Sequence, residues 1–236
     1  MDYSHRHLEV CGSTNDEART WAADPDDPAP DLACLTASAQ TAGRGRHGRR
    51  WDADTGVSAI LSIVVRPPDG SGVWAMGLAA AVAVAEAVEQ VGGRALLKWP
   101  NDVLVDGRKV AGVLVEASSN PTLVVVGIGV NVGQASFPEE ETYAFPPTSL
   151  FLSLGRSIDP AEVAQAVVDR FRHWELVRRE QGVRPIVDAW RARIASGVPM
   201  RSGAVEGRLQ DILGDGRALV ALPDGTQATL TSVDTA

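Results

Sequence analysis

Cysteine is nearly absent from this chain, which has 236 residues and only two cysteines, Cys11 and Cys34. Two such cysteines match no metal-binding spacing, and a disulfide framework in a small secreted domain would need more of them. We therefore expect both side chains to be buried thiols rather than a disulfide, and we assign them no chemical role.

Long apolar runs are also missing. No stretch of about eighteen apolar residues occurs anywhere in the chain. The first residues, MDYSHRHLEVCGS, do not combine a basic segment with an apolar one. The sequence therefore predicts neither a membrane span nor a secretion signal, and we expect a cytoplasmic protein with no membrane partner.

An excess of positive charge is the third absence. The formal net charge is −8, whereas proteins that bind nucleic acid normally carry a broad basic face. Nucleic acid is therefore not an expected partner. The composition, with 44% hydrophobic and 22% charged residues, is ordinary for a globular protein with one sizeable core and room for a small second domain.

The texture of the sequence changes near Ser196, where we place a boundary between residues 1–196 and residues 197–236. In the first part we expect a helix after the capping run Ser13 to Glu17, and further helices over Val73–Val91, Pro160–Gln181 and Ile186–Ala195. Strands are expected at His7–Val10, Leu32–Ser38, Val57–Val65, Leu96–Trp99, Val103–Val105, Val110–Val115 and Thr122–Val132. Asp106-Gly107 predicts a hairpin turn. Beyond Gly197, short strand-like runs separated by GDG and PDG predict a small antiparallel barrel or sheet.

The stretch GRGRHGRRW, Gly43 to Trp51, concentrates four arginines in an acidic chain. Its glycines satisfy the spacing G-x-G-x-x-G, but that dinucleotide motif must open a helix, and this stretch leads into another strand. No Gly-Lys-Ser/Thr follows, so a Walker A loop is excluded. The remaining interpretation is a loop whose arginines bind phosphate or carboxylate oxygens, with a solvated basic loop as the alternative. Trp51 fits either a base-stacking residue or a core residue.

Two further motifs place polar groups beside glycines. KWPNDVLVDGRKVAGVLVE, Lys98 to Glu116, displays Asn101 and Asp102 at a strand end, either as a site or as a plain turn. In the same motif Lys109 follows the hairpin turn, and Gly112 leaves room for a ligand beside the backbone. VVVGIGVNV, Val124 to Val132, interrupts a buried strand with glycines and places the amide of Asn131 near its end.

Taken together and in this order, with Ser13-Thr14-Asn15 upstream, these motifs resemble those of biotin protein ligases, and the resemblance extends over essentially the whole chain. It implies an α+β catalytic domain like that of class II synthetases, with a mixed, largely antiparallel sheet flanked by helices, followed by an SH3-like barrel. It also implies two reactions. Biotin and ATP form biotinyl-5′-AMP and pyrophosphate, and a lysine of a biotin carboxyl carrier domain then attacks the activated carbonyl.

The resemblance also implies a set of site residues. Lys109, Asp102, Arg46 and Arg49 are the expected catalytic residues: the cations activate the carboxyl and the phosphates, and Asp102 receives or orients the proton of the acceptor lysine. Trp51 and Asn131, with Arg46 and Arg49, are expected to bind the nucleotide. The expected biotin-binding residues are Ser13, Thr14, Asn15, Gln40, Gly43, Arg44, Lys109 and Gly112. Mg²⁺ is expected to enter with ATP, held by phosphates and water, so no protein ligand is named.

Alternatives remain at this stage. A lipoate-attaching ligase would use a similar fold, and an adenylate-binding regulator without ligase activity would use the same motifs. His47 stands where the family often has arginine or an aliphatic residue, so we give it no charged role. Because so little sequence precedes Ser13, we do not expect the N-terminal DNA-binding domain that some members carry. A homodimer is considered, but no motif selects it.

Overall fold

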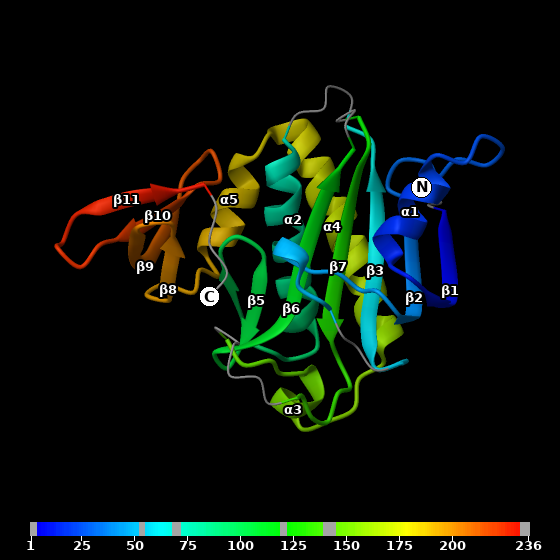
Figure 1. Ribbon diagram of the computed structural model, residues 1–236, viewed down its shortest axis with the longest axis horizontal. Helices are drawn as coiled ribbons and strands as arrows, with labels where there is room; N and C mark the ends of the chain where they lie inside the picture. The colour runs from blue at the N-terminus through cyan, green and yellow to red at the C-terminus, as the bar shows by residue number, and fades with distance from the viewer. Residues whose placement is uncertain (1–3, 52–54, 68–71, 119–121, 139–144, 232–236) are drawn as a thin grey trace.

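The computed structural model describes residues 4–51, 55–67, 72–118, 122–138 and 145–231. Its strands form a seven-stranded sheet of order β1-β2-β3-β7-β6-β5-β4 and a four-stranded sheet of order β11-β10-β9-β8 (Figure 1). The large sheet consists of β1 (His5–Cys11), β2 (Cys34–Gln40), β3 (Ser58–Val65), β4 (Ala95–Lys98), β5 (Asp102–Val105), β6 (Arg108–Ala117) and β7 (Val124–Asn131). The helices are α1 (Thr14–Ala22), a 3-10 turn η1 (Arg46–Gly48), α2 (Val73–Gln90), α3 (Leu150–Leu154), α4 (Pro160–Gln181) and α5 (Arg184–Arg191).

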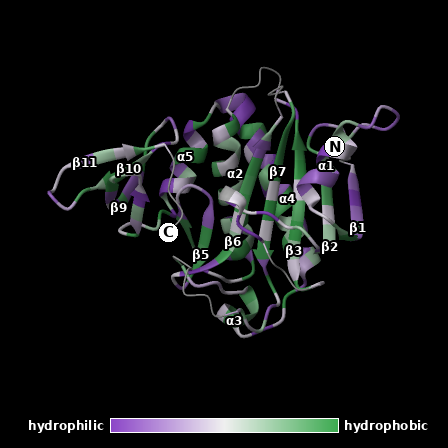
Figure 2. Ribbon diagram, in the orientation of Figure 1, coloured by the Kyte–Doolittle hydropathy of each residue, from purple (hydrophilic) through white to green (hydrophobic). Residues whose placement is uncertain are grey.

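The large sheet is mixed and mostly antiparallel, as expected. Strands β1 and β2 run parallel, because α1 carries the chain back between them, and the other neighbouring pairs are antiparallel. Helices α2, α4 and α5 cover one face, while α1 packs on the other face against β2, β3 and β7 (Figure 1). Hydrophobic residues concentrate in the middle of this sheet, and hydrophilic residues lie along its edge strand β1 (Figure 2).

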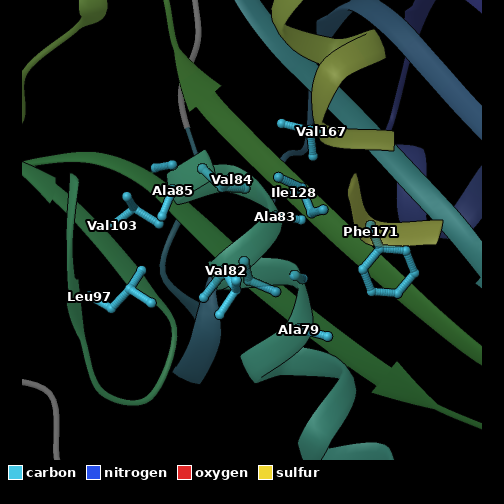
Figure 3. Packing of buried hydrophobic residues seen from close by; sticks show 14 of the residues in the cluster. Ala79, Val82, Ala83, Val84, Ala85, Leu97, Val103, Ile128, Val167 and Phe171 are labelled. Atoms are coloured by element: carbon cyan, nitrogen blue, oxygen red, sulfur yellow. The ribbon is translucent and has the colours of Figure 1, made fainter. Parts of the chain in front are cut away.

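Helix α2 forms the centre of the core. Its sequence, VWAMGLAAAVAVAEAVEQ, has apolar residues on all sides, and most of them are buried. By length and composition alone α2 could cross a membrane, but here Val82 and its alanine neighbours pack between the sheet and Phe171 of α4 (Figure 3). A helix that is hydrophobic all round is stable when it is enclosed in this way.

Several expectations about local structure are confirmed. The helix predicted over Pro160–Gln181 has those bounds. The hairpin between β5 and β6 turns at Asp106 and Gly107, whose φ angles are 50° and 72°, as a type I′ turn requires. One expectation about capping is wrong: Ser13 is the N-cap residue of α1, but its side chain makes no capping hydrogen bond. The short helix α3, within the sequence LFLSL, was not predicted.

The small sheet contains β8 (Pro199–Ser202), β9 (Val205–Ile212), β10 (Ala218–Ala221) and β11 (Gln227–Leu230). Every neighbouring pair is antiparallel. Within residues 197–231 the strands follow one another in a linear order, and the structure does not show them closed into a barrel. The sheet is attached to the large one, because Trp99 Nε1 donates a hydrogen bond of 2.8 Å to the carbonyl oxygen of Gly216.

Candidate active site

A cavity of about 810 Å³ lies on the face of the large sheet that carries α1. Its walls are residues of α1, the loop from Arg44 to Trp51, and strands β8 to β10 of the small sheet. A cavity of this size fits the usual range for small-molecule sites, about 300–1,000 Å³. The site therefore combines segments that are far apart in the sequence, from Ser13 to Pro223.

Glycines form the floor of the cavity. In the register of β6 and β7, Gly112 lies opposite Gly129, and both glycines are contacted by the indole of Trp51. A Cβ atom added to Gly129 would overlap the indole, and one added to Gly112 would lie 3.3 Å from Trp51 Cζ3. Two residues earlier on β7, a Cβ at Gly127 would overlap the side-chain amide of Asn15. The glycines are needed because flat side chains lie directly on the backbone there.

A chain of neutral polar groups lies at the Asn15 end of this floor. The amide N–H and the hydroxyl of Thr14 both donate to Gln40 Oε1, at 2.7 and 3.0 Å. The hydroxyl of Ser62, on β3, lies 2.8 Å from Thr14 Oγ1 and 2.6 Å from Asn15 Oδ1. Ser13, Thr14, Asn15 and Ser62 are all buried. This end of the cavity is built to offer both donors and acceptors to a polar ligand.

The opposite end carries three charged side chains from the second motif. Lys109 Nζ lies 2.5 Å from Asp102 Oδ1, and Lys98 Nζ lies 3.2 Å from Asp102 Oδ2. Burial alone would raise the pKa of Asp102, but the charges of Lys109 and Lys98 outweigh it and lower that pKa. The carboxylate is therefore ionised at neutral pH and is a weak proton acceptor.

The backbone around Lys109 is fixed on both sides. Its N–H donates to the carbonyl oxygen of Pro146, and its own carbonyl accepts from the N–H of Thr148, both at 2.9 Å. Nearby, the amide of Asn131 donates to the carbonyl of Thr148 at 3.0 Å and accepts from Gln134 Nε2 at 3.2 Å. The segment after Phe145 therefore positions Lys109 and Asn131 together.

The arginine-rich loop is closed by its own backbone. Trp51 N–H donates to Gly43 O at 3.0 Å, and Gly45 N–H donates to Arg49 O at 2.8 Å. Arg46 is half-buried, and its Nη1 donates to Asn101 Oδ1 at 3.3 Å. Burial lowers the pKa of Arg46, partly offset by the charge of Asp102.

The other loop arginines differ from Arg46. Arg49 and Arg50 are exposed where they line the cavity. Arg44 is held by Asp16 through two hydrogen bonds of 2.5 and 2.7 Å. Like Lys109, Arg44 is therefore a residue proposed for binding whose side chain has an anionic partner.

All the residues selected from the sequence, except Gly43, are among those that line the cavity, and Gly43 adjoins it with its backbone bonded to Trp51. Sequence reasoning considered Asn101 as a site residue but missed Lys98, Glu116, Ser62 and the strand residues of the small sheet. Lys98 and Glu116 stand at the two ends of the motif from Lys98 to Glu116, whereas Ser62 is a polar residue inside the buried apolar run of β3. Nothing in the sequence connects residues 199–223 with the cavity.

The described part of the chain holds no group of three or more His, Cys, Asp or Glu side chains placed to bind a metal ion. The three glutamates at 139–141, read from the sequence as a solvated face, lie outside the described residues.

Comparison with known proteins identifies relatives along most of the chain. Residues 9–132 match the model of the biotin/lipoate A/B protein ligase family. A biotin–[acetyl-CoA-carboxylase] ligase from Paracoccus denitrificans is 36% identical over 208 residues, which cover 83% of this chain and 86% of that protein. A bifunctional ligase/repressor from Bacillus spizizenii is 33% identical over 85% of this chain, but the match spans only 63% of the relative's length.

Solved structures extend this similarity to three dimensions. The biotin protein ligase of Aquifex aeolicus in complex with biotin and ATP superimposes with a TM-score of 0.84 at 27% identity, covering 97% of this chain and 96% of that one. The similarity therefore includes both sheets.

Proposed function

The chain belongs to the biotin/lipoate A/B protein ligase family, and from this premise we propose that it is a biotin protein ligase. It joins biotin to ATP to form biotinyl-5′-AMP and pyrophosphate. It then transfers the biotinyl group to a lysine of a biotin carboxyl carrier domain, such as that of acetyl-CoA carboxylase, and releases AMP. Biotin, ATP and the carrier domain are its substrates.

The observation that carries this proposal is the order of chemical groups along the glycine floor. Asn15 lies on Gly127, Trp51 lies on Gly129, and Lys109 Nζ would be 3.5 Å from a Cβ at Gly112. A neutral polar end, an indole and an ammonium group thus follow one another. Biotin has the same sequence of groups: a ureido ring with donors and acceptors, an apolar chain, and a carboxylate. Lipoate has an apolar dithiolane ring, which would offer neither a donor nor an acceptor to this polar end of the cavity.

In the first step one carboxylate oxygen of biotin attacks the α-phosphorus of ATP, the new C–O–P linkage forms, and the bond to the β-phosphate breaks. Two anions must approach each other, so cations at the meeting point stabilise both the encounter and the charge that develops. We assign this role to Lys109 and Arg46, with Arg49 at the cavity mouth. Asn131 remains our proposal for the adenosine end, and we propose that Trp51, which lies beside the biotin chain, also stacks on the base. Mg²⁺ would be carried in by the phosphates of ATP.

In the second step the acceptor amine attacks the acyl carbon, the tetrahedral intermediate collapses, and AMP leaves with the shared oxygen. The amine must first lose a proton. Because Lys109 and Lys98 lower the pKa of Asp102 despite its burial, this carboxylate is better suited to orienting cations than to removing protons. We propose that it positions Lys109 and attracts the acceptor ammonium group.

We also propose that residues from about 197 onward form a small SH3-like barrel, of which β8 to β11 are the described part. Their three successive hairpins support this. A cytoplasmic location is proposed from the two cysteines, which are both buried and unpaired. The homodimer considered from the sequence stays a prediction.

The test is to incubate the pure protein with biotin, MgATP and a biotin carboxyl carrier domain. We expect pyrophosphate release and a single biotinyl group on one lysine of the carrier. A carrier whose target lysine is replaced by arginine serves as the control. Pyrophosphate release with lipoate instead of biotin would favour the lipoate alternative, and adenylate binding without transfer would favour a regulator.

We predict that Arg46→Ala shortens the time for which the adenylate stays on the enzyme. A charge-assisted hydrogen bond contributes about 1.5–3 kcal/mol, so its loss corresponds to about a 10- to 100-fold faster release. The measurement is the decay of enzyme-bound biotinyl-5′-AMP after rapid gel filtration. Arg184→Ala, at an exposed position with 91% of its side chain accessible, is the control. Equal lifetimes in the variant and the wild type would refute the assignment.

We further predict that Gly129→Ala weakens biotin binding about tenfold, because the added methyl group must displace the indole of Trp51 and overpacking costs about 1–3 kcal/mol. Isothermal titration with biotin measures the effect. Gly77→Ala is the matched control, since its added Cβ would meet Val115 Cγ2 at an ordinary 3.5 Å. Unchanged affinity in Gly129→Ala would show that the floor does not contact biotin.

A further inference from the structure

Four charged side chains beside the cavity form a closed network outside the proposed chemistry. They come from separate parts of the chain: Asp16 and Arg19 from α1, Arg44 from the loop, and Glu116 from β6. The two carboxylates and two guanidinium groups balance each other at neutral pH. None of the four is fully exposed; their side chains retain between 27% and 48% of their accessible surface.

Arg44 is the member that links this network to the loop. Its two terminal nitrogens bind the two oxygens of Asp16 at 2.5 and 2.7 Å, the parallel fork that is favourable for arginine and a carboxylate. One of them also lies 3.5 Å from Glu116 Oε2. These hydrogen bonds raise the pKa of the Arg44 guanidinium and lower that of Asp16.

Glu116 is the member that links the network to the polar end of the cavity. Its Oε2 atom accepts hydrogen bonds from Asn15 Nδ2 at 2.8 Å and from Arg19 Nη2 at 3.1 Å. A carboxylate can only accept, so the amide of Asn15 must turn its nitrogen toward Glu116 and its oxygen toward Ser62. Glu116 therefore fixes the orientation in which the Asn15 amide is presented to a ligand in the cavity.

The arginines of the loop thus divide into two kinds. The charge of Arg44 is balanced by Asp16, so it contributes little net field to a bound polyphosphate. Arg46, by contrast, donates to the neutral amide of Asn101 and keeps its charge available to a ligand. The loop is attached to α1 at Arg44, and its ligand-facing portion starts after that residue.

We propose that Asp16 and Glu116 are positioning residues for biotin: Asp16 fixes the start of the arginine-rich loop through Arg44, and Glu116 orients the Asn15 amide toward the ureido ring. This inference rests on the proposed function. It also replaces the expectation that the side chain of Arg44 holds the biotin carboxylate or the phosphates. Both carboxylates act on binding rather than on the reacting atoms.

The test uses Asp16→Asn and Glu116→Gln in the full chain, with Glu17→Gln as the control because it removes the same charge from α1 outside the network. We expect the KM for biotin to rise about tenfold in both variants, with kcat for pyrophosphate release changed by less than about threefold. Asp16→Asn should also accelerate tryptic cleavage between Arg44 and Arg50 in the absence of biotin, and saturating biotin should restore protection.

The possible outcomes distinguish a failure of the proposed function from a failure of the positioning roles of Asp16 and Glu116. A wild-type protein that releases no pyrophosphate with biotin would remove the proposed function. A wild-type protein that is active, with variants whose KM and cleavage rate match it or match Glu17→Gln, would overturn this inference alone. A lowered melting temperature with an unchanged KM for biotin would likewise overturn this inference, because a purely structural role changes only the melting temperature. If Glu116→Gln does not fold, Asp16→Asn still decides the claim for the loop.

Discussion

Lys109→Ala is expected to slow the formation of biotinyl-5′-AMP by about 10²- to 10³-fold, the usual effect of removing one preorganised group that stabilises transition-state charge. The loss of biotin affinity should be smaller, because the carboxylate of bound biotin can still be solvated or paired with Arg46. The measurement is single-turnover pyrophosphate release at saturating biotin and ATP, alongside the equilibrium affinity for biotin.

Lys98→Ala provides the comparison that isolates this effect. Lys98 and Lys109 are the only two lysines in the chain, and both bind the carboxylate of Asp102. If Lys109 acted only by neutralising Asp102, the two variants would lose similar amounts of rate. We expect the loss to be at least tenfold larger for Lys109→Ala, because Lys109 lies beside the glycine floor. Losses confined to biotin affinity would contradict a role in the chemical step.

Glu175→Ala is expected to destabilise the protein by about 3–5 kcal/mol, the cost of removing one partner from a buried ion pair. Glu175 is fully buried on α4, and its two oxygens accept hydrogen bonds of 2.7 to 2.8 Å from Arg178 and Arg179. Arg178 is itself only 9% exposed. Without Glu175 this guanidinium is left in the interior without its carboxylate, and the link from Arg179 to Asp31 is weakened too.

Thermal unfolding measures this effect. At roughly 2–4 °C per kcal/mol for a chain of this size, the melting temperature should fall by about 6–20 °C. Asp169→Ala, on the same helix with a side chain that is 62% exposed and an ion pair of 4.0 Å, should lower stability by less than about 1 kcal/mol. Similar melting temperatures for both variants would show that the Glu175 cluster contributes little.

Much of the fold could be predicted because its helices and turns are determined by local sequence patterns. The apolar run of α2, the Asp106-Gly107 turn and the helix opening at Pro160 each depend on residues that are near neighbours in the sequence. The barrel expected after residue 197 is a different case, since closure depends on how distant strands meet. Alternating strands and turns predict antiparallel pairing, and the structure shows that pairing in a linear order.

The site was predictable in its motifs but not in its pairings. The motifs supplied Lys109, Asp102, Arg46 and Asn15. The ion pairs of Asp102 lie within one motif, but the partners of other site residues lie far away in the chain. The role of Arg44 in binding biotin stays a prediction, but no local pattern indicated that its side chain pairs with Asp16, 28 positions earlier. Glu116 stood at the end of a quoted motif, but its hydrogen bond to Asn15 spans 101 positions. Such contacts arise only when strands and helices assemble.

The walls of the cavity come from opposite parts of the polypeptide: Ser13 to Asn15 from near its beginning, and strand residues as late as Pro223 from near its end. A ribosome therefore releases the head-group residues long before the segment that completes the enclosure. The cavity is therefore complete only after the small sheet has emerged and docked.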